Sequence, residues 1–326
     1  HYVSPTGGAI IDLVRHGQDG GDSLNQIAQV TGILPDDGVA YHSLELYDQR
    51  PTLVAVVARG TLYGRPKVEV VTRYELRPCE PGVRIRTELY HGGADPMTFF
   101  LSDVFYWGGR EVTPFVPLAG QGYTHPELDL LTIDTAFRPI PFMAGQDHVT
   151  PGSAYATVRC DAPTADAFQS DTVSAAGPPR TIVQPGGGLV YERFVAAAAT
   201  PGMQGAVDVM AEARGQLFGD TWVEVRGQTL SEVSSPMGGD PRLVSLLVYE
   251  VAQSGAPEEG IPWTEIVPAA DGTFAAKLPA HRDLVIQPHV LGRPVDTVLS
   301  LTTGADDLVL DPIALPALAT LEVNVH

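Results

Sequence analysis

The sequence has 326 residues, of which 44% are hydrophobic and only 18% are charged. This length exceeds one ordinary core of about 100–150 residues, so we expect two domains, and the hydrophobic content excludes wholesale disorder. The formal net charge of −19 opposes binding to nucleic acid or to an anionic membrane surface. No apolar run reaches the ~20 residues that a membrane span requires.

Residues that form turns are abundant, with 34 glycines and 28 prolines, and this composition is typical of an all-β chain. Apolar and polar residues alternate through the first two thirds of the sequence. The alternation predicts strands joined by tight turns, and therefore antiparallel pairing. The expected strands lie in residues 39–48, 52–62, 66–78, 83–90, 97–109, 110–117, 153–160 and 187–198.

One segment has helical spacing. Val207, Met210, Ala211 and Arg214 recur at that interval, which predicts a short helix over 203–214 with Gly215 as its C-terminal cap. The stretch 162–185, rich in Ala, Ser, Pro and Gly, is expected to be a long loop. We place the domain boundary near residue 218.

Short strands resume after the boundary. They are expected in residues 221–230, 241–253, 261–267, 271–301 and 318–325, which is enough for an immunoglobulin-like or prealbumin-like sandwich. The chain begins at His1 without a signal peptide and ends within an alternating run at His326. We therefore expect either that processing removed a leader or, as we favour, that the chain is a section of a longer polypeptide.

The second region resembles the carboxypeptidase regulatory-like (prealbumin-like) sandwich. The pieces that carry the resemblance are 223–227 (VEVRG), 245–250 (SLLVYE), 271–279 (DGTFAAKLP) and 291–293 (LGR). The usual motif after the opening strand is degraded here to 228–241, QTLSEVSSPMGGDP. The resemblance covers about a third of the chain and implies a small β-sandwich over 219–326.

The first region is similar to the supersandwich of galactose-mutarotase-like proteins and of bacterial multidomain surface proteins. The resemblance rests on 7–14 (GGAIIDLV), 74–91 (YELRPCEPGVRIRTELYH) and 97–109 (MTFFLSDVFYWGG). Some of these surface proteins continue into a metal-dependent phosphoesterase domain, and residues 191–216 look like the linker found there. The resemblance implies a large antiparallel supersandwich over 1–218.

A mutarotase-like enzyme needs an acid and a base that face one sugar. His91, at a strand end, and His125 with Glu127, after a Gly-rich loop, are the candidates for these roles. Tyr106 and Trp107 are candidates for stacking on a sugar ring. The competing interpretation, which we favour, is that these are loop and core residues without a shared site.

Three further features are candidates for metal or covalent chemistry. His1, with His16 or His42, has the residue types of a copper brace, but we favour the interpretation that His1 is only a processing boundary, because nothing downstream resembles the copper enzymes. Cys79 and Cys160 are expected either to form one disulfide or to be idle thiols. Acidic loops are candidates for calcium, with solvated loops as the default: Asp19, Asp22, Asp36, Asp37, Asp306, Asp307 and Asp311.

We therefore predict an all-β protein: a large antiparallel supersandwich over 1–218, a smaller sandwich over 219–326, and one short helix near the junction. The predicted function is a non-enzymatic extracytoplasmic module, acting as a surface or filament scaffold or as a carbohydrate-recognition unit. Its predicted partners are carbohydrate or other protein subunits, with no nucleic acid and no membrane insertion, and with no cofactor except calcium as an alternative. The alternatives are a mutarotase-like enzyme, or an accessory region of a larger metal-dependent hydrolase.

Overall fold

The structure is a computed structural model of the whole chain. It describes residues 7–11, 13–14, 24–32, 37–80, 82–107, 112–119, 134–147, 153–169, 173–200, 202–231, 236–240, 243–251 and 260–316. The chain is all-β with one helix in this described part, as the alternation predicts. It divides into two compact units, unit 1 within 1–117 and 124–220 and unit 2 within 118–123 and 221–326.

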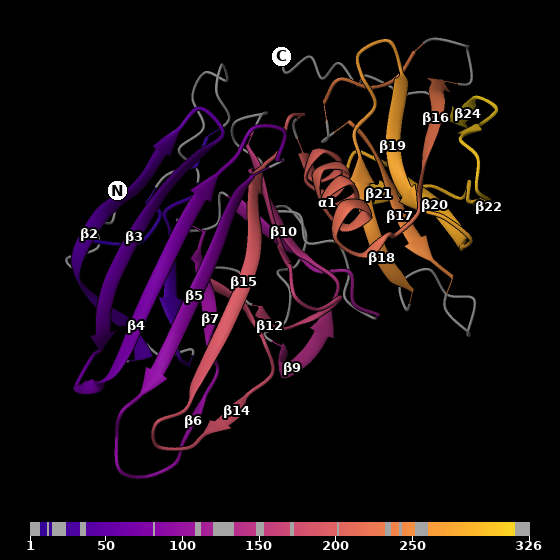
Figure 1. The fold of residues 1–326 in the computed structure, drawn as a ribbon. Helices are drawn as coiled ribbons and strands as arrows, with labels where there is room; N and C mark the ends of the chain where they lie inside the picture. The colour runs from indigo at the N-terminus through magenta and orange to yellow at the C-terminus, as the bar shows by residue number, and fades with distance from the viewer. Residues whose placement is uncertain are drawn as a thin grey trace, which may run out of the picture. The chain divides into compact units, whose positions relative to one another are not determined.

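An eight-stranded sheet forms the larger layer of unit 1 (Figure 1). All of its strand pairs are antiparallel, and neighbours in sequence are neighbours in space from β2 to β5. In spatial order its strands are β2 (Val39–Arg50), β3 (Leu53–Leu62), β4 (Arg65–Leu76), β5 (Val83–His91), β15 (Gly188–Ala197), β11 (Ala154–Arg159), β10 (Met143–Asp147) and β8 (Val112–Phe115).

A five-stranded antiparallel sheet forms the second layer of unit 1. Its order is β1 (Gln26–Val30), β7 (Ser102–Tyr106), β13 (Val173–Gly177), β12 (Ala165–Gln169) and β9 (Asp134–Ile140). A separate two-stranded ribbon pairs β6 (Met97–Phe99) with β14 (Thr181–Val183). The predicted single strand over 97–109 is thus divided between the ribbon and the five-stranded sheet.

The prediction of a long loop over 162–185 is wrong, because this stretch contains β12, β13 and β14. Small side chains hid the pattern: Ala175 and Ala176 are buried although the segment looks like a linker by composition. Alanine and serine fit where the five-stranded sheet is covered on both faces, and packing decides strand formation more than intrinsic propensity does.

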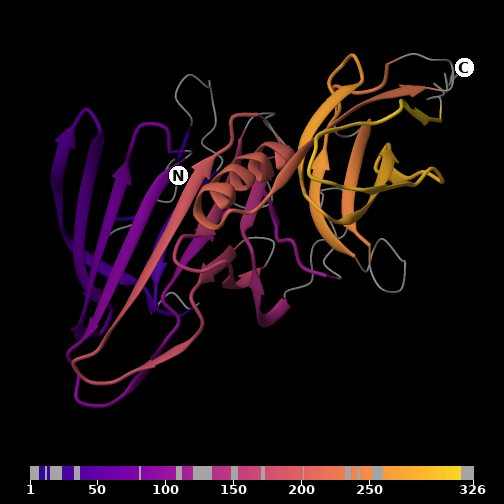
Figure 2. The ribbon, with the colours of Figure 1, turned by 45° about the vertical axis from the view of Figure 1, so that its right-hand side comes forward.

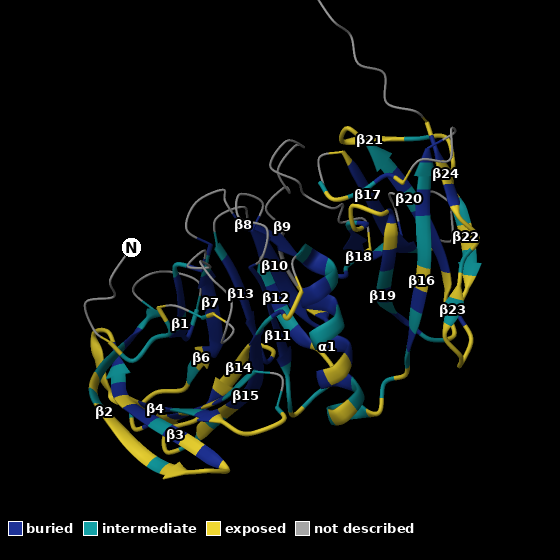
Figure 3. Cartoon of the chain, turned by 90° about the horizontal axis from the view of Figure 1, so that it is seen from above, coloured by how far each residue is buried: buried dark blue, intermediate teal, exposed yellow. Residues whose placement is uncertain are grey.

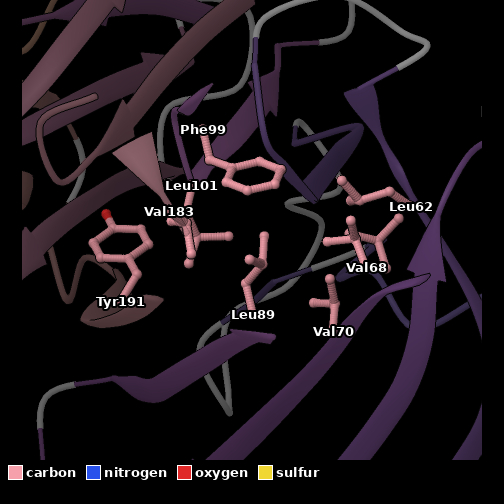
Figure 4. Close-up of a cluster of buried hydrophobic side chains, with 9 residues drawn as sticks. Leu62, Val68, Val70, Leu89, Phe99, Leu101, Val183 and Tyr191 are labelled. Carbon is pink, nitrogen blue, oxygen red and sulfur yellow. The ribbon is translucent and has the colours of Figure 1, made fainter. Parts of the chain in front are cut away.

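Apolar side chains from the large sheet, from the β6–β14 ribbon and from Leu101 form a buried cluster in unit 1 (Figure 4). They include three residues of the large sheet's central strands, Val68, Val70 and Leu89, which lie on alternate positions of their strands. The other members of this cluster are Val39, Leu62, Phe99, Leu101, Val183 and Tyr191. Period-two alternation therefore sets which face of the sheet is buried.

The helix α1 (Gly202–Phe218) is longer than predicted (Figure 2). Gly215 lies inside it, and the helix ends instead before Gly219, whose φ of 73° is the left-handed conformation of a C-terminal glycine. The Gly219 N–H donates to the Gly215 carbonyl at 3.1 Å. An interior glycine is tolerated because packing against β10 and β11 stabilises the helix. No helix in the described ranges is long and apolar enough to cross a membrane.

Unit 2 consists of two small sheets. One contains β19 (Thr273–Pro279), β16 (Trp222–Ser231), β23 (Leu308–Val309) and β24 (Ile313–Leu315), and the other contains β18 (Ile261–Ile266), β17 (Val244–Glu250), β20 (Asp283–Val290), β21 (Arg293–Pro294) and β22 (Leu299–Thr302). Pairing is not purely antiparallel, because β16 runs parallel to β23 and β24. The resemblance of this region to a carboxypeptidase regulatory-like sandwich stays a prediction.

Candidate functional site

His91, the candidate acid or base, is the last residue of β5 and is only 1% exposed. Both ring nitrogens are used locally: Nε2 lies 2.7 Å from the Asp95 carbonyl oxygen, and the Gly93 N–H donates to Nδ1 at 3.4 Å. The ring also packs edge-on against Phe99. His91 therefore holds the loop after β5 in place, and its ring does not reach solvent.

Trp107 is likewise part of the interior rather than of a sugar platform. It is 1% exposed, its indole N–H donates to Ser174 Oγ at 2.8 Å, and its ring stacks on Phe105. A stacking role requires an exposed ring face, which Trp107 lacks. Tyr106 is partly buried against a cluster that includes Phe100.

The two cysteines are both free thiols, so the structure contains no Cys79–Cys160 disulfide. Cys79 is exposed in the turn between β4 and β5, where its φ is 65°. Cys160 follows β11 and is partly buried, and burial raises the pKa of its thiol to about 12. A thiol with so high a pKa is a poor nucleophile at neutral pH.

Half of the predicted metal ligands lie outside the described residues, as do His125 and Glu127 of the candidate acid–base pair. These ligands are His1, His16, Asp19, Asp22 and Asp36. Asp37 is described, and its carbonyl oxygen accepts a hydrogen bond from the Thr31 N–H at 2.9 Å. Within the described ranges, no group of three or more His, Cys, Asp or Glu side chains is placed to hold a metal ion.

The main cluster of polar side chains lies between the two sheets of unit 1. Arg193 on β15 and Asp103 on β7 are both fully buried, and Arg193 Nε donates to Asp103 Oδ2 at 2.6 Å while its second terminal nitrogen reaches Oδ1. Gln29 on β1 also donates to Oδ1, at 3.1 Å. The Arg193 guanidinium lies over the Tyr191 ring, 4.6 Å from its centre. This ion pair connects the two layers.

A chain of side-chain hydrogen bonds forms a second connection from Arg193 to the Asp103 carboxylate. Arg193 donates to Thr87 Oγ1 at 2.7 Å, and Thr87 lies 3.1 Å from Thr72 Oγ1. Thr72 is 2.6 Å from the hydroxyl of Tyr41, which donates to Gln29 Oε1 at 3.0 Å. Because that tyrosine proton is committed to Gln29, every donor along the path points away from Arg193 and toward the carboxylate. Such one-way chains polarise each other and strengthen each bond.

The tyrosines of this network are held in their neutral form. Burial raises the pKa of Tyr41 and of Tyr74, whose hydroxyl also donates to Gln29 Oε1, at 2.8 Å. Burial also raises the pKa of Tyr191. For Arg193, burial opposes the charged form, but the Asp103 carboxylate outweighs it and raises the pKa. The network is thus a satisfied, charge-neutral core.

Sequence reasoning missed Arg193 and Asp103, although a signal was present. In 188–197 (GLVYERFVAA) the alternation places Arg193 on the same face as Tyr191 and Val195, and both of these are buried. In 102–106 (SDVFY) Asp103 shares a face with the buried Phe105. One cation and one anion, each on the apolar face of a predicted strand, indicate a buried pair.

The opposite face of the large sheet carries surface ion pairs. Arg84 donates to Glu80 at 3.0 Å and to Glu192 at 2.7 Å, and Arg86 donates to Glu88 at 2.8 Å. Partial burial opposes the charge of Arg84, but hydrogen bonds to the two carboxylates outweigh it and raise the pKa. The α1 helix packs against β10, β11 and β15 of the large sheet, and the Met203 N–H donates to Gln146 Oε1 on β10.

No protein-family model matches the sequence, and no curated protein matches it. Among solved structures, a GH36 α-galactosidase from Geobacillus stearothermophilus in complex with stachyose aligns at 9% identity and a TM-score of 0.42 over 68% of this chain and 39% of its own. A galactose mutarotase-like protein from Lactobacillus casei aligns at 10% identity and a TM-score of 0.33, over 53% and 85%. The Slr1438 protein from Synechocystis aligns at 15% identity and a TM-score of 0.31, over 52% and 78%.

The chain spans about a third of the length of the α-galactosidases that it matches. At these TM-scores the alignments carry no argument about what this chain binds or does.

Proposed function

We propose that the chain is a non-catalytic, extracytoplasmic β-sandwich module that acts by binding, as a surface or filament scaffold. The observation that carries the proposal is the closed interior of unit 1. There the Arg193–Asp103 pair and its hydrogen-bonded partners occupy the space between the sheets, and each of the two side chains is 0% exposed.

A general acid or base must come within hydrogen-bonding distance of its substrate. His91 does not meet this condition, because its side chain is buried and both ring nitrogens already have partners. Asp103 does not meet it either, because Arg193 and Gln29 occupy its two oxygens. These side chains stabilise the sandwich, and the exposed sheet faces and edges are left for recognition.

Carbohydrate recognition is a second candidate, favoured by one exposed side chain. Tyr90 on β5 is 50% exposed, beside Glu88 and diagonal to Val190 of β15. An exposed aromatic ring next to charged hydrogen-bonding groups is the combination on which a sugar ring stacks. A glycan array probed with the wild-type chain and with Tyr90→Ala tests this role, with Tyr63→Ala, 41% exposed in the turn between β3 and β4, as the control.

The alternative of a mutarotase-like enzyme now depends on His125 and Glu127. Polarimetry of freshly dissolved galactose and glucose distinguishes it from a scaffold, because an enzyme accelerates mutarotation and a scaffold leaves the buffer rate unchanged. The other alternative, an accessory region of a larger metal-dependent hydrolase, predicts hydrolysis only when neighbouring domains are present. Fractionation of the source cells tests the extracytoplasmic location.

A further inference from the structure

The first strand of the large sheet has one unpaired side. In the described part of the chain β2 is the end strand of the eight-stranded order, and its backbone ladder runs only along β3. Two irregularities, between Tyr41 and Ser43 and between Leu46 and Asp48, leave Ser43–Leu46 as an uninterrupted stretch. An open strand edge is a template for an added strand, and bulges limit how far the added strand can extend.

Two large apolar side chains on this stretch are exposed toward the sandwich side of the sheet. Leu44 is 63% exposed and Leu46 is 60% exposed. Much of β2 carries the colour of exposed residues in Figure 3. Leu44 lies in the same lateral row as Ala58 and Thr72, both of which are buried in the interior. The row is thus covered in the middle of the sheet but uncovered at its edge, where its side chain is apolar.

The residue between the two leucines, Glu45, lies on the other face. Its lateral row continues through Val57 to Arg73 and Arg86 and ends at Glu192, where Arg86 forms an ion pair at 3.3 Å. Glu45 itself has no ion pair with any described residue. A cation placed laterally beside it, on the open side of β2, would extend the row by one cross-strand pair of opposite charge.

We propose that β2 accepts an extended segment of another protein, in which apolar and basic residues alternate, as an added strand along Ser43–Leu46. The proposal rests on the scaffold function proposed above and names its partner. Backbone hydrogen bonds to the free edge supply affinity, and side chains at alternate positions supply specificity. Two apolar side chains of the segment cover Leu44 and Leu46, and the basic side chain between them faces Glu45.

The test measures fluorescence anisotropy of labelled octapeptides with the full chain, at about 0.15 M salt so that long-range charge effects are screened. One peptide alternates valine and arginine, and the other alternates valine and glutamate. The expected result is binding of the arginine peptide only. Glu45→Arg is expected to weaken that binding at least about tenfold and to create binding of the glutamate peptide, since like charges directly opposite are destabilising.

Glu69→Arg is the matched control. It makes the same change of charge at an exposed glutamate that also has no described ion pair, but on β4, which has neighbours on both sides. It is expected to leave binding unchanged. Leu46→Ser is expected to weaken binding of the arginine peptide, whereas Val309→Ser, at an 82% exposed position of unit 2, is expected to leave it unchanged.

Equal weakening by Glu45→Arg and Glu69→Arg would overturn the proposal, since it would show general attraction to an anionic chain. If neither the arginine peptide nor the glutamate peptide binds, the proposal is overturned as well. So would a homodimer, seen by sedimentation, that Glu45→Arg dissociates, because the occupant of the edge would then be a second copy. None of these peptide-binding results bears on catalysis. The polarimetry experiment therefore tests the non-catalytic scaffold proposal independently of the partner proposed for β2.

Discussion

Arg193 on β15 and Asp103 on β7 face each other across the interior of unit 1, with Arg193 Nε 2.6 Å from Asp103 Oδ2 and both side chains fully buried. Removing two charges from water costs several kcal/mol per ion, and only full hydrogen bonding offsets that cost. Here the carboxylate accepts from Arg193 twice and from Gln29. The pair therefore fixes the position of one sheet relative to the other. It also explains why the polar side chains in this interior have a structural role.

Removing one partner of this pair should be costly. Arg193→Met leaves an unpaired carboxylate in the core and should lower the free energy of unfolding by about 3–5 kcal/mol. The double variant Arg193→Met with Asp103→Leu should recover much of that loss, because no buried charge remains. Urea unfolding of the single and double variants measures both values, and a single variant as stable as wild type contradicts the account.

The second hydrogen-bonded path, which runs through Tyr41, should contribute less to the free energy of unfolding than the ion pair does. Tyr41→Phe removes the hydroxyl that accepts from Thr72 and donates to Gln29. The Thr72 hydroxyl then loses its acceptor, while Gln29 Oε1 keeps the hydrogen bond from Tyr74, and the loss should cost about 1–3 kcal/mol. Tyr47→Phe is the control, because Tyr47 is 61% exposed and its ring, which contacts Arg73, is kept. Equal unfolding free energies for the two variants would show that the path contributes nothing.

The pKa of His289 gives a pH dependence to unit 2. Burial lowers this pKa below the ordinary 6.5, against the opposing effect of a hydrogen bond to the Gly292 backbone. The unfolded state thus binds more protons, so the contribution of His289 to stability is complete above pH 6.5 and is lost as the pH falls through the folded-state pKa. His289→Gln should flatten this dependence, as read from hydrogen exchange of β17 and β20 amides, and exposed His42→Gln should not.

Thiol reactivity provides a separate check. At neutral pH the exposed Cys79 should react quickly with iodoacetamide, whereas Cys160, with its pKa raised to about 12, should react only after unfolding. Mass spectrometry after timed alkylation counts the modified thiols. Two unreactive cysteines that become reactive on reduction would instead show the disulfide.

Alternation in the sequence was sufficient for the all-β class and for the hairpins from β2 to β5, because side-chain period and burial coincide there. Alternation was insufficient where tertiary packing, and not the local sequence pattern, determined the secondary structure. Ala175 and Ala176 form part of a buried strand despite a linker-like composition, and α1 continues past Gly215 because β10 and β11 support it. The Arg193–Asp103 pair joins positions 90 residues apart, a separation that local spacing does not encode. His91, by contrast, looked available because it ends a strand, yet Phe99 and the following loop cover it.

The most direct test of the central claim, that this chain binds rather than catalyses, is polarimetry of galactose and glucose mutarotation with the complete 326-residue chain. The account predicts the same rate with protein as with buffer. An accelerated rate that disappears in both His125→Ala and Glu127→Gln would contradict it and would establish the mutarotase-like enzyme instead.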